Sequence, residues 1–316
     1  MIKAIRIHGH GGPDVMRFED IELPPPGPGE VRVRHTAVAL NFSDINVRRG
    51  GFYQKDPLPM PIILGNEAAA VVTALGPGVD TWRVGDRVGY VGMGAGFFQN
   101  TGSYAQERNV FAARLAPIPD DISDVQAASI MLKGLTVSNI INKIYQPKPG
   151  DTVLIHAAAG GVGHYAVQIA KHLGANVTGT SSASKKDFVW SLGADAHIDY
   201  TTFNWETATP VFDFVLDTIG GDNIDHSLYV AKAGSTLISI PTGLNEAVVE
   251  KAKARQVDGY FFLVTSNGED MQVIADWLGK GILKSHVSAI YPFEELAKAH
   301  EQVESGRTTG KVVVTL

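Results

Sequence analysis

The stretch TVLIHAAAGGVGHYAVQIAKHLGANVTGTS, residues 152–181, carries the clearest fold signal in this chain of 316 residues. TVLIHA (152–157) is a continuous apolar run, as a strand covered on both faces of a parallel sheet requires. Glycines follow it, and apolar side chains then recur at helical spacing, at Val162, Ala166, Ile169 and Leu173. ANVTGTS (175–181) reads as a second strand. The stretch therefore predicts the first strand–helix–strand unit of a doubly wound parallel sheet.

The same alternation continues downstream. FDFVLDT (212–218) and STLISIP (235–241) read as further strands, and KKDFVWSLGA (185–194) reads as a helix. A helix is expected from about Phe293, and KVVVTL (311–316) is a final strand that could return to the first domain. Before about Asp121, short β-like runs alternate with Gly and Pro, which is typical of a compact, mostly β unit.

Composition narrows the function classes. The formal charge of −6 is spread without long like-charged runs, so a nucleic-acid partner is not expected. The absence of cysteine excludes disulfides, thiolate zinc sites and cysteine nucleophiles. No apolar run approaches the roughly 20 residues that cross a bilayer, and the first residues do not resemble a leader, so a cytoplasmic protein without a membrane partner is expected.

The glycine turn has the chemistry of a pyrophosphate site. Backbone N–H groups must converge on the phosphates at a helix N-terminus, and Gly160, Gly161 and Gly163, with Val162 among them, stand at that place. Ala158 occupies the position usually given to the first glycine, and its methyl group is tolerated only if φ stays negative. The alternative is a tight turn that binds nothing.

The end of the second strand bears on the choice of cofactor. An NAD enzyme places an acid there against the ribose 2′-hydroxyl, whereas this chain has the hydroxyls of Thr180, Ser181 and Ser182 followed by Lys185 and Lys186. Hydroxyls and cations suit a 2′-phosphate, so NADPH is predicted in preference to NADH. The alternative is a capped helix start with two solvated lysines.

Several ordered stretches resemble the zinc-free quinone oxidoreductase (zeta-crystallin-like) branch of the medium-chain dehydrogenase/reductase superfamily. They are NFSDINVRRG, ILGNEAAAVV, LGPGVDTWRVGDRV, GSYAQE, MLKGLTV, HAAAGGVG, VLDTIGG and TGKVVVTL. The resemblance implies an α/β protein with a GroES-like, mostly β catalytic domain (1–121 and 266–316) and a Rossmann dinucleotide-binding domain (122–265). It also implies a cofactor cleft at their junction and a homodimer formed through the edge near residues 260–264.

The resemblance also provides a test for metal. Zinc relatives bind the metal through a Cys three residues before an Asp and through the His of a Gly-His-Glu run, whereas this chain has Asn41, before Asp44, and Asn66. Amides are poor zinc ligands, so no metal is expected. Without a Lewis acid the acceptor must itself be electrophilic, which predicts reduction of a quinone. The alternatives are an enone, 2-alkenal or haloacrylate-type alkene reductase, or a non-catalytic NADPH-binding protein like the lens crystallins.

The resemblance suggests individual site residues. Asn41 is predicted as an amide donor, Tyr53 as a cofactor or substrate contact, and Lys133 as a catalytic cation. The alternatives are that Asn41 only caps a turn, that Tyr53 is an ordinary half-buried residue and that Lys133 is solvated. Phe52 and Tyr53 could also exchange roles. The predicted cofactor contacts are Asn41, Tyr53, Thr136, Gly160, Gly161, Val162, Gly163, Thr180, Ser181, Ser182, Lys185, Tyr200, Ser239, Pro241 and Arg307. His156 and His164 are expected to serve packing, and Arg48, Arg49 and DNIDH (222–226) to be solvated charge.

Overall fold

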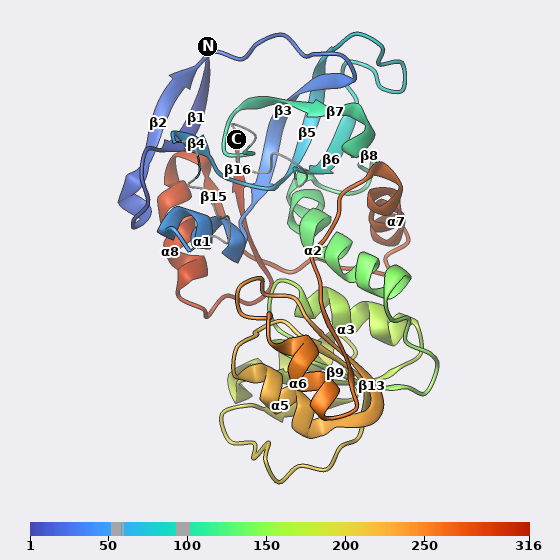
Figure 1. The fold of residues 1–316 in the computed structure, drawn as a ribbon. Coiled ribbons are helices and arrows are strands. Elements are labelled where there is room, and N and C mark those ends of the chain that lie inside the picture. Colours follow the sequence, from blue (N-terminus) through green and yellow to red (C-terminus); the bar gives the residue numbers. More distant parts are fainter. Residues whose placement is uncertain (52–57, 59, 93–101) are drawn as a thin grey trace. The chain divides into compact units, whose positions relative to one another are not determined.

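The computed structural model describes residues 1–51, 58, 60–92 and 102–316. The described chain divides into two compact units (Figure 1). Unit 1 comprises Met1–Leu135, Thr265–Gly281 and Ser285–Leu316, and unit 2 comprises Thr136–Val264 and Ile282–Lys284. The helix α2 (Asp124–Lys143) continues from one unit into the other. Of the predicted site residues, Tyr53 lies outside the described residues.

Unit 1 is built on two sheets. A small sheet has the order β2-β1-β4, and a larger one has the order β15-β16-β3-β5-β6-β8, with β7 paired to β3. The strands are β1 (Ile2–Ile7), β2 (Met16–Ile21), β3 (Glu30–Ala39), β4 (Ile62–Ile63), β5 (Glu67–Leu75), β6 (Arg87–Val91), β7 (Glu107–Phe111), β8 (Leu115–Pro117), β15 (Val287–Pro292) and β16 (Lys311–Thr315). The final strand β16 pairs antiparallel with β3, so the end of the chain does return to the N-terminal sheet.

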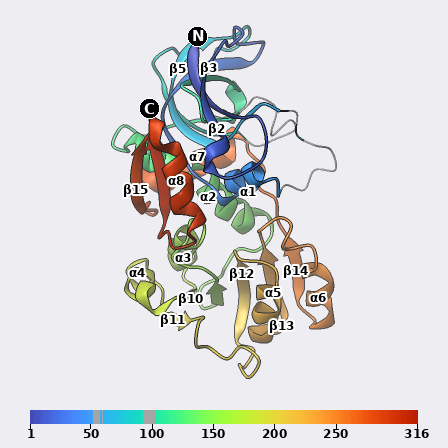
Figure 2. The same cartoon turned by 90° about the vertical axis from the view of Figure 1, so that its left-hand side faces the viewer.

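Strand alternation builds the core of unit 1. In β3, Val31 and Val33 point inward between more accessible neighbours and join a buried cluster with Val72 of β5 and Val312 of β16. Besides the first part of α2, the described helices of this unit include α1 (Phe42–Arg49), α7 (Gly268–Gly279) and α8 (Leu296–Glu304). α1 and α8 pack against each other beside β16, as Figures 1 and 2 both show.

The contact between α1 and α8 corrects the expectation that Arg48 is solvated. Ile45 and Arg48 are three residues apart on one face of α1, and both are fully buried. The Arg48 guanidinium donates to the carboxylate of Glu304 on α8, and the mostly exposed Arg49 reaches the same carboxylate at 2.8 Å. Arg48 is therefore a buried ion-pair residue that joins the two helices.

Unit 2 is a six-stranded parallel sheet with the order β11-β10-β9-β12-β13-β14 (Figure 2). Its strands are β9 (Thr152–Ile155), β10 (Asn176–Ser181), β11 (Ala196–Asp199), β12 (Phe212–Asp217), β13 (Ala231–Ser239) and β14 (Asp258–Phe261). The chain runs outward from β9 to β11 and then resumes at β12 on the other side of β9. This reversal is the switch point at which doubly wound sheets bind ligands, beyond the carboxyl ends of the strands. The prediction of a doubly wound parallel sheet is confirmed.

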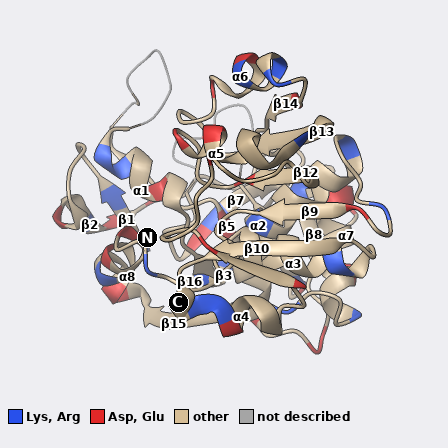
Figure 3. Ribbon diagram, turned by 90° about the horizontal axis from the view of Figure 1, so that it is seen from below, with Lys and Arg blue, Asp and Glu red and all other residues tan. Residues whose placement is uncertain are grey.

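The helices of unit 2 are α3 (Gly163–His172), α4 (Lys186–Ser191), α5 (Asn223–Val230) and α6 (Val248–Ala254). Most residues of α3 are buried. The strands β9 and β10 carry no charged residue, as Figure 3 shows. Part of the DNIDH run, expected as solvated charge, starts α5, and its Ile224 is buried. Within the described residues, no helix combines the length and apolar character that a bilayer span demands.

Candidate functional site

A buried polar cluster surrounds the start of α1 in unit 1. Asn41 precedes the helix, and its backbone N–H donates to the carboxylate of Asp44 at 2.9 Å, which caps the first turn. Asn66 donates from Nδ2 to the same carboxylate at 2.5 Å. Asp44 therefore accepts from the backbone of Asn41 and from the side-chain amide of Asn66, the two residues that stand at the metal-ligand positions of zinc relatives.

Lys311 and Glu67 form an ion pair inside this cluster. The Lys311 Nζ lies 2.8 Å from Glu67 Oε1, and the two side chains are 2% and 0% exposed. The ammonium also donates to Asn41 Oδ1 and to the Leu40 carbonyl, both at 2.9 Å. Glu67 in turn accepts from Asn41 Nδ2 at 2.9 Å and from the backbone N–H of Leu132 at 2.5 Å. A buried pair of this kind is stable only when its remaining donors and acceptors are satisfied, as they are here.

The Asn41 carboxamide is consequently held by the protein itself. Its oxygen accepts from Lys311, and its nitrogen donates to Glu67 and, at 3.4 Å, to the Ala39 carbonyl. Because the ammonium of Lys311 can only donate, the orientation of the amide is unambiguous. Donation from Asn41 to a bound molecule would require one of these hydrogen bonds to be released.

Lys133 is the free cation near this cluster. It lies on α2 directly after Leu132, is partly exposed, and its Nζ makes no hydrogen bond within the described residues. Burial lowers the pKa of its ammonium to about 8, Lys311 acts in the same direction, and Glu67 and Asp44 oppose the shift. An ammonium with a pKa near neutrality is able to donate a proton.

Asp44 is also connected to two buried rings. The Tyr104 hydroxyl lies 3.2 Å from Asp44 Oδ2, and His300 Nε2 of α8 lies 3.1 Å from the same hydroxyl. Burial raises the pKa of the Asp44 carboxyl to about 6, with a further contribution from Glu67. Burial lowers the pKa of His300 to about 3, so this ring is neutral at physiological pH.

In unit 2, the glycine turn joins β9 to α3 with the backbone that close packing requires. Ala157 adopts a left-handed conformation with φ of +46°, whereas φ of Ala158 does not fall in that region. A Cβ on Gly163 would lie 2.2 Å from the Ala157 carbonyl oxygen and 2.7 Å from the Ala158 Cα. Gly163 therefore permits the close contact of helix and strand that the dinucleotide fingerprint requires.

The methyl group of Ala158 is accommodated by a glycine on the neighbouring strand. Ala158 is fully buried, and a Cβ built on Gly179 of β10 would lie 2.7 Å from the Ala158 Cβ. The space that the usual first glycine would leave inside the turn is thus provided by Gly179 instead. Sequence reasoning missed this pairing because the two positions are joined only by the strand register.

The hydroxyls at the end of β10 differ in accessibility. Thr180 and Ser181 are buried, and their hydroxyls bond to protein groups, including His197 Nε2 at 2.8 Å from Ser181 Oγ. Ser182 is partly exposed, and its hydroxyl pairs with that of Ser184 at 3.0 Å. Lys185 is partly exposed, and burial lowers its pKa. Ser182, Lys185 and Lys186 are therefore the accessible part of the predicted set, and the exposed Ser184, which was not predicted, lies beside Ser182.

The other predicted residues occupy varied places. Ser239 is buried and donates to Asp217 at 2.9 Å, Pro241 follows β13 and accepts from the Leu244 N–H, and Tyr200 is exposed after β11. Thr136 is a buried residue of α2 in unit 2, whereas Arg307 is an exposed residue of unit 1 between α8 and β16.

Several residues of the unit 1 cluster were not found from the sequence, namely Tyr104, His300 and Lys311. The one available signal was the charge of Lys311 at the start of an otherwise apolar final strand.

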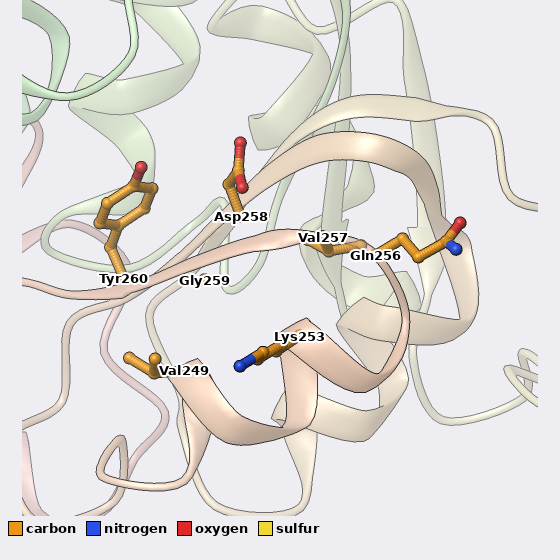
Figure 4. Close-up of a pocket in the computed structure, with 7 residues that line it drawn as sticks. All are labelled: Val249, Lys253, Gln256, Val257, Asp258, Gly259 and Tyr260. Carbon is orange, nitrogen blue, oxygen red and sulfur yellow. The ribbon is translucent and has the colours of Figure 1, made fainter.

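A pocket of about 350 Å³ lies beside the edge strand of unit 2 (Figure 4). It is lined from α6 by Val249 and Lys253 and from β14 by Asp258 and Tyr260, and its described lining includes none of the predicted site residues. Among the described residues, no group of three or more His, Cys, Asp or Glu side chains is arranged to hold a metal ion.

Comparisons with known proteins agree with this architecture. A family model described as "Alcohol dehydrogenase GroES-like domain" matches residues 27–120, and one described as "Zinc-binding dehydrogenase" matches residues 192–314. The chain is 36% identical to the 2-haloacrylate reductase of a Burkholderia species over 99% of both chains. The solved quinone oxidoreductase from Coxiella burnetii is 31% identical with a TM-score of 0.93, covering 100% of this chain and 99% of its own.

The quinone oxidoreductase of Escherichia coli, solved in complex with NADPH, is 29% identical with a TM-score of 0.85 over 99% of this chain and 100% of that chain. A Rossmann sheet with a glycine turn and a GroES-like unit define the class as medium-chain dehydrogenases/reductases. Within that superfamily the chain belongs to the zinc-free quinone oxidoreductase branch, so the resemblance inferred from the sequence is confirmed.

Proposed function

We propose that this protein is an NADPH-dependent oxidoreductase that reduces quinones by hydride transfer without a metal. The proposal rests on the presence of two features in the same chain. A glycine turn is shaped for a pyrophosphate in unit 2, and in unit 1 the side-chain amides of Asn41 and Asn66 donate to the carboxylates of Glu67 and Asp44, respectively. Relatives named as quinone oxidoreductases align with nearly the whole chain, which supports the same activity.

The residues of unit 2 fit the cofactor. Gly160, Gly161 and Gly163 keep side chains away from the N-terminus of α3, where N–H groups bind phosphates. Ser182 and Lys185 offer an accessible hydroxyl and a cation for the 2′-phosphate. The remaining proposed contacts are Asn41, Tyr53, Thr136, Val162, Ser181, Tyr200, Ser239, Pro241 and Arg307, and Thr180 lies in the same region at the end of β10. When bound, NADPH supplies a hydride.

Lys133 is the proposed catalytic cation. Reduction of a quinone or an activated alkene places negative charge on an oxygen, which a nearby ammonium stabilises and then protonates. Lys133 is the residue of the cluster whose Nζ is free of protein partners in the described chain, and its pKa of about 8 keeps it mostly protonated at neutral pH. Asn41 is proposed to donate to the same oxygen, which requires its Nδ2 to release the 3.4 Å hydrogen bond to the Ala39 carbonyl, and Tyr53 remains a proposed contact.

The nearest alternative is an activated alkene as acceptor, because one relative is a 2-haloacrylate reductase and another is an NADPH-dependent alkenal/one oxidoreductase. Consumption of NADPH with matched panels of quinones, enones and haloacrylates separates these acceptors. We expect the highest kcat/KM with a quinone. Higher values with an alkene would reassign the acceptor, and tight NADPH binding with no turnover on any panel would favour a crystallin-like binding protein.

We also propose a cytoplasmic homodimer formed through β14. This strand is the edge of the six-stranded sheet, and Tyr260, Phe261 and Leu263 expose apolar surface there. An apolar edge strand invites pairing with a second copy. Sedimentation of the purified protein should give a dimer, and a Phe261→Lys substitution should shift it toward monomer. A monomeric native protein would contradict the assignment.

A further inference from the structure

We infer that Thr180 is a positioning residue that holds the backbone of the glycine turn and serves NADPH and NADH alike, rather than a ligand of the 2′-phosphate. The inference rests on the proposed cofactor function and changes the role of a residue within it. Thr180 lies in the hydroxyl run at the end of β10, yet it is 0% exposed. A side chain without accessible surface is directed into the protein rather than toward a ligand.

Both polar groups of Thr180 bond to the start of the turn. Its Oγ1 lies 3.2 Å from the backbone nitrogen of Ala157 and accepts that N–H, and its carbonyl accepts the N–H of Ala158 at 2.9 Å. Ala157 and Gln256 are the non-glycine residues of the described chain with positive φ. Residues with a Cβ rarely adopt this conformation unless their surroundings fix it. Thr180 supplies that fixation at the residue where the turn begins.

Hydrogen-bond directions show that the Thr180 hydroxyl has no proton left for a ligand. Ser227 Oγ lies 2.9 Å from the Asn223 carbonyl, which can only accept, so its proton points there. Ser227 Oγ then accepts from His156 Nε2 at 3.2 Å. A neutral imidazole that donates from Nε2 accepts at Nδ1, where Thr180 Oγ1 lies at 3.4 Å.

The imidazole of His156 in this chain of hydrogen bonds is neutral. Burial lowers the pKa of His156 to about 4, against the attraction of Asp217. The chain therefore runs from the Ala157 N–H through Thr180, His156 and Ser227 to the Asn223 carbonyl. Thr180, His156 and Ser227 each donate one proton and accept another, which is a structural reason for His156 at the start of the HAAAGG sequence.

The neighbouring hydroxyls of Thr180 and Ser182 therefore have different roles. The pyrophosphate is common to NADPH and NADH, so loss of Thr180 Oγ1 should weaken both cofactors by the same factor. Ser182 is partly exposed, and its hydroxyl bonds to the exposed Ser184, so it is the matched control, available for the proposed contact with the 2′-phosphate.

The experiment compares Thr180→Val, which keeps the shape and removes the hydroxyl, with Thr180→Ser, which keeps the hydroxyl, and with Ser182→Ala. Dissociation constants for NADPH and NADH are measured by titration. Hydrogen exchange over residues 156–160 is measured in the protein without cofactor. Thr180→Ala replaces the valine variant if that variant does not fold.

We expect Thr180→Val to raise both dissociation constants about tenfold and to accelerate exchange of the Ala157 amide by at least about tenfold, because this N–H loses its acceptor. Thr180→Ser should stay within about twofold of the native protein, and Ser182→Ala should weaken NADPH alone.

Weaker binding of NADPH with unchanged NADH in Thr180→Val would overturn the inference, as would unchanged exchange. A native protein that binds neither nucleotide would refute the proposed function instead, and the exchange comparison would still decide the role of Thr180.

Discussion

Replacement of Lys311 by Met tests the buried ion pair of unit 1. The ammonium lies 2.8 Å from Glu67 Oε1 with both side chains almost fully buried, and it makes two further hydrogen bonds to Leu40 and Asn41. The substitution leaves the Glu67 carboxylate buried without its counter-charge. Removal of one partner from such a pair costs about 3–5 kcal/mol. For a domain of this size that corresponds to a fall in Tm of about 5–15 °C.

The control is a surface pair with the same geometry. Lys3 Nζ also lies 2.8 Å from Asp20 Oδ2, but these side chains are 52% and 50% exposed. Lys3→Met should therefore cost less than about 1 kcal/mol. Circular dichroism during thermal and urea unfolding measures both variants.

The double variant Lys311→Met/Glu67→Gln separates the pair from its surroundings. It removes both charges, so its loss of stability should be smaller than the sum of the two single losses by about 2 kcal/mol or more. If Lys311→Met were no more damaging than Lys3→Met, or if the two single losses simply added, the buried pair would not have the role assigned to it.

Three further variants test other contacts. Lys133→Met should be more stable than the native protein at pH 7, by on the order of 1–3 kcal/mol. Burial lowers the pKa of Lys133 from 10.5 to about 8, so between these pH values the unfolded chain binds more protons than the folded protein. The native protein therefore regains stability as the pH rises from about 8 to 10.5. Urea unfolding at pH 7 and pH 10 measures whether the stability advantage of Lys133→Met over the native protein shrinks. Gly179→Ala should cost about 1–3 kcal/mol because its methyl would lie 2.7 Å from the Ala158 Cβ, and Ala158→Gly should restore part of the loss in a double-mutant cycle. Arg48→Met should lower Tm far more than Arg49→Met, since the Arg48 side chain is 0% exposed and that of Arg49 is 56% exposed; equal effects would contradict the burial argument.

The sequence predicted the parts of the fold that local patterns encode. The apolar run of β9, the glycines after it and the helical spacing of α3 lie within about twenty residues, so periodicity and turn chemistry suffice to place them. The family resemblance then supplied the GroES-like unit. Asp222 of the run 222–226 is exposed, as expected for solvated charge, but the short helix α5 that begins within this run gives only a weak periodic signal and was not predicted.

The site was harder to predict because its contacts are non-local. Lys311 and Glu67 are 244 positions apart, and only the pairing of β16 with β3 brings Lys311 to the cluster. At the end of β10, the sequence alone does not distinguish the three consecutive hydroxyl residues Thr180, Ser181 and Ser182. The structure separates buried Thr180 and Ser181 from accessible Ser182, because side-chain direction depends on the strand and on where it ends.

We propose that hydride transfer to an electrophilic acceptor proceeds in this protein without a metal. The most direct test is the rate of NADPH consumption with benzoquinone by protein dialysed against a strong chelator, compared with the same protein after addition of zinc. Equal kcat/KM is expected in the two samples. A loss of activity on chelation that zinc restores would contradict the proposal.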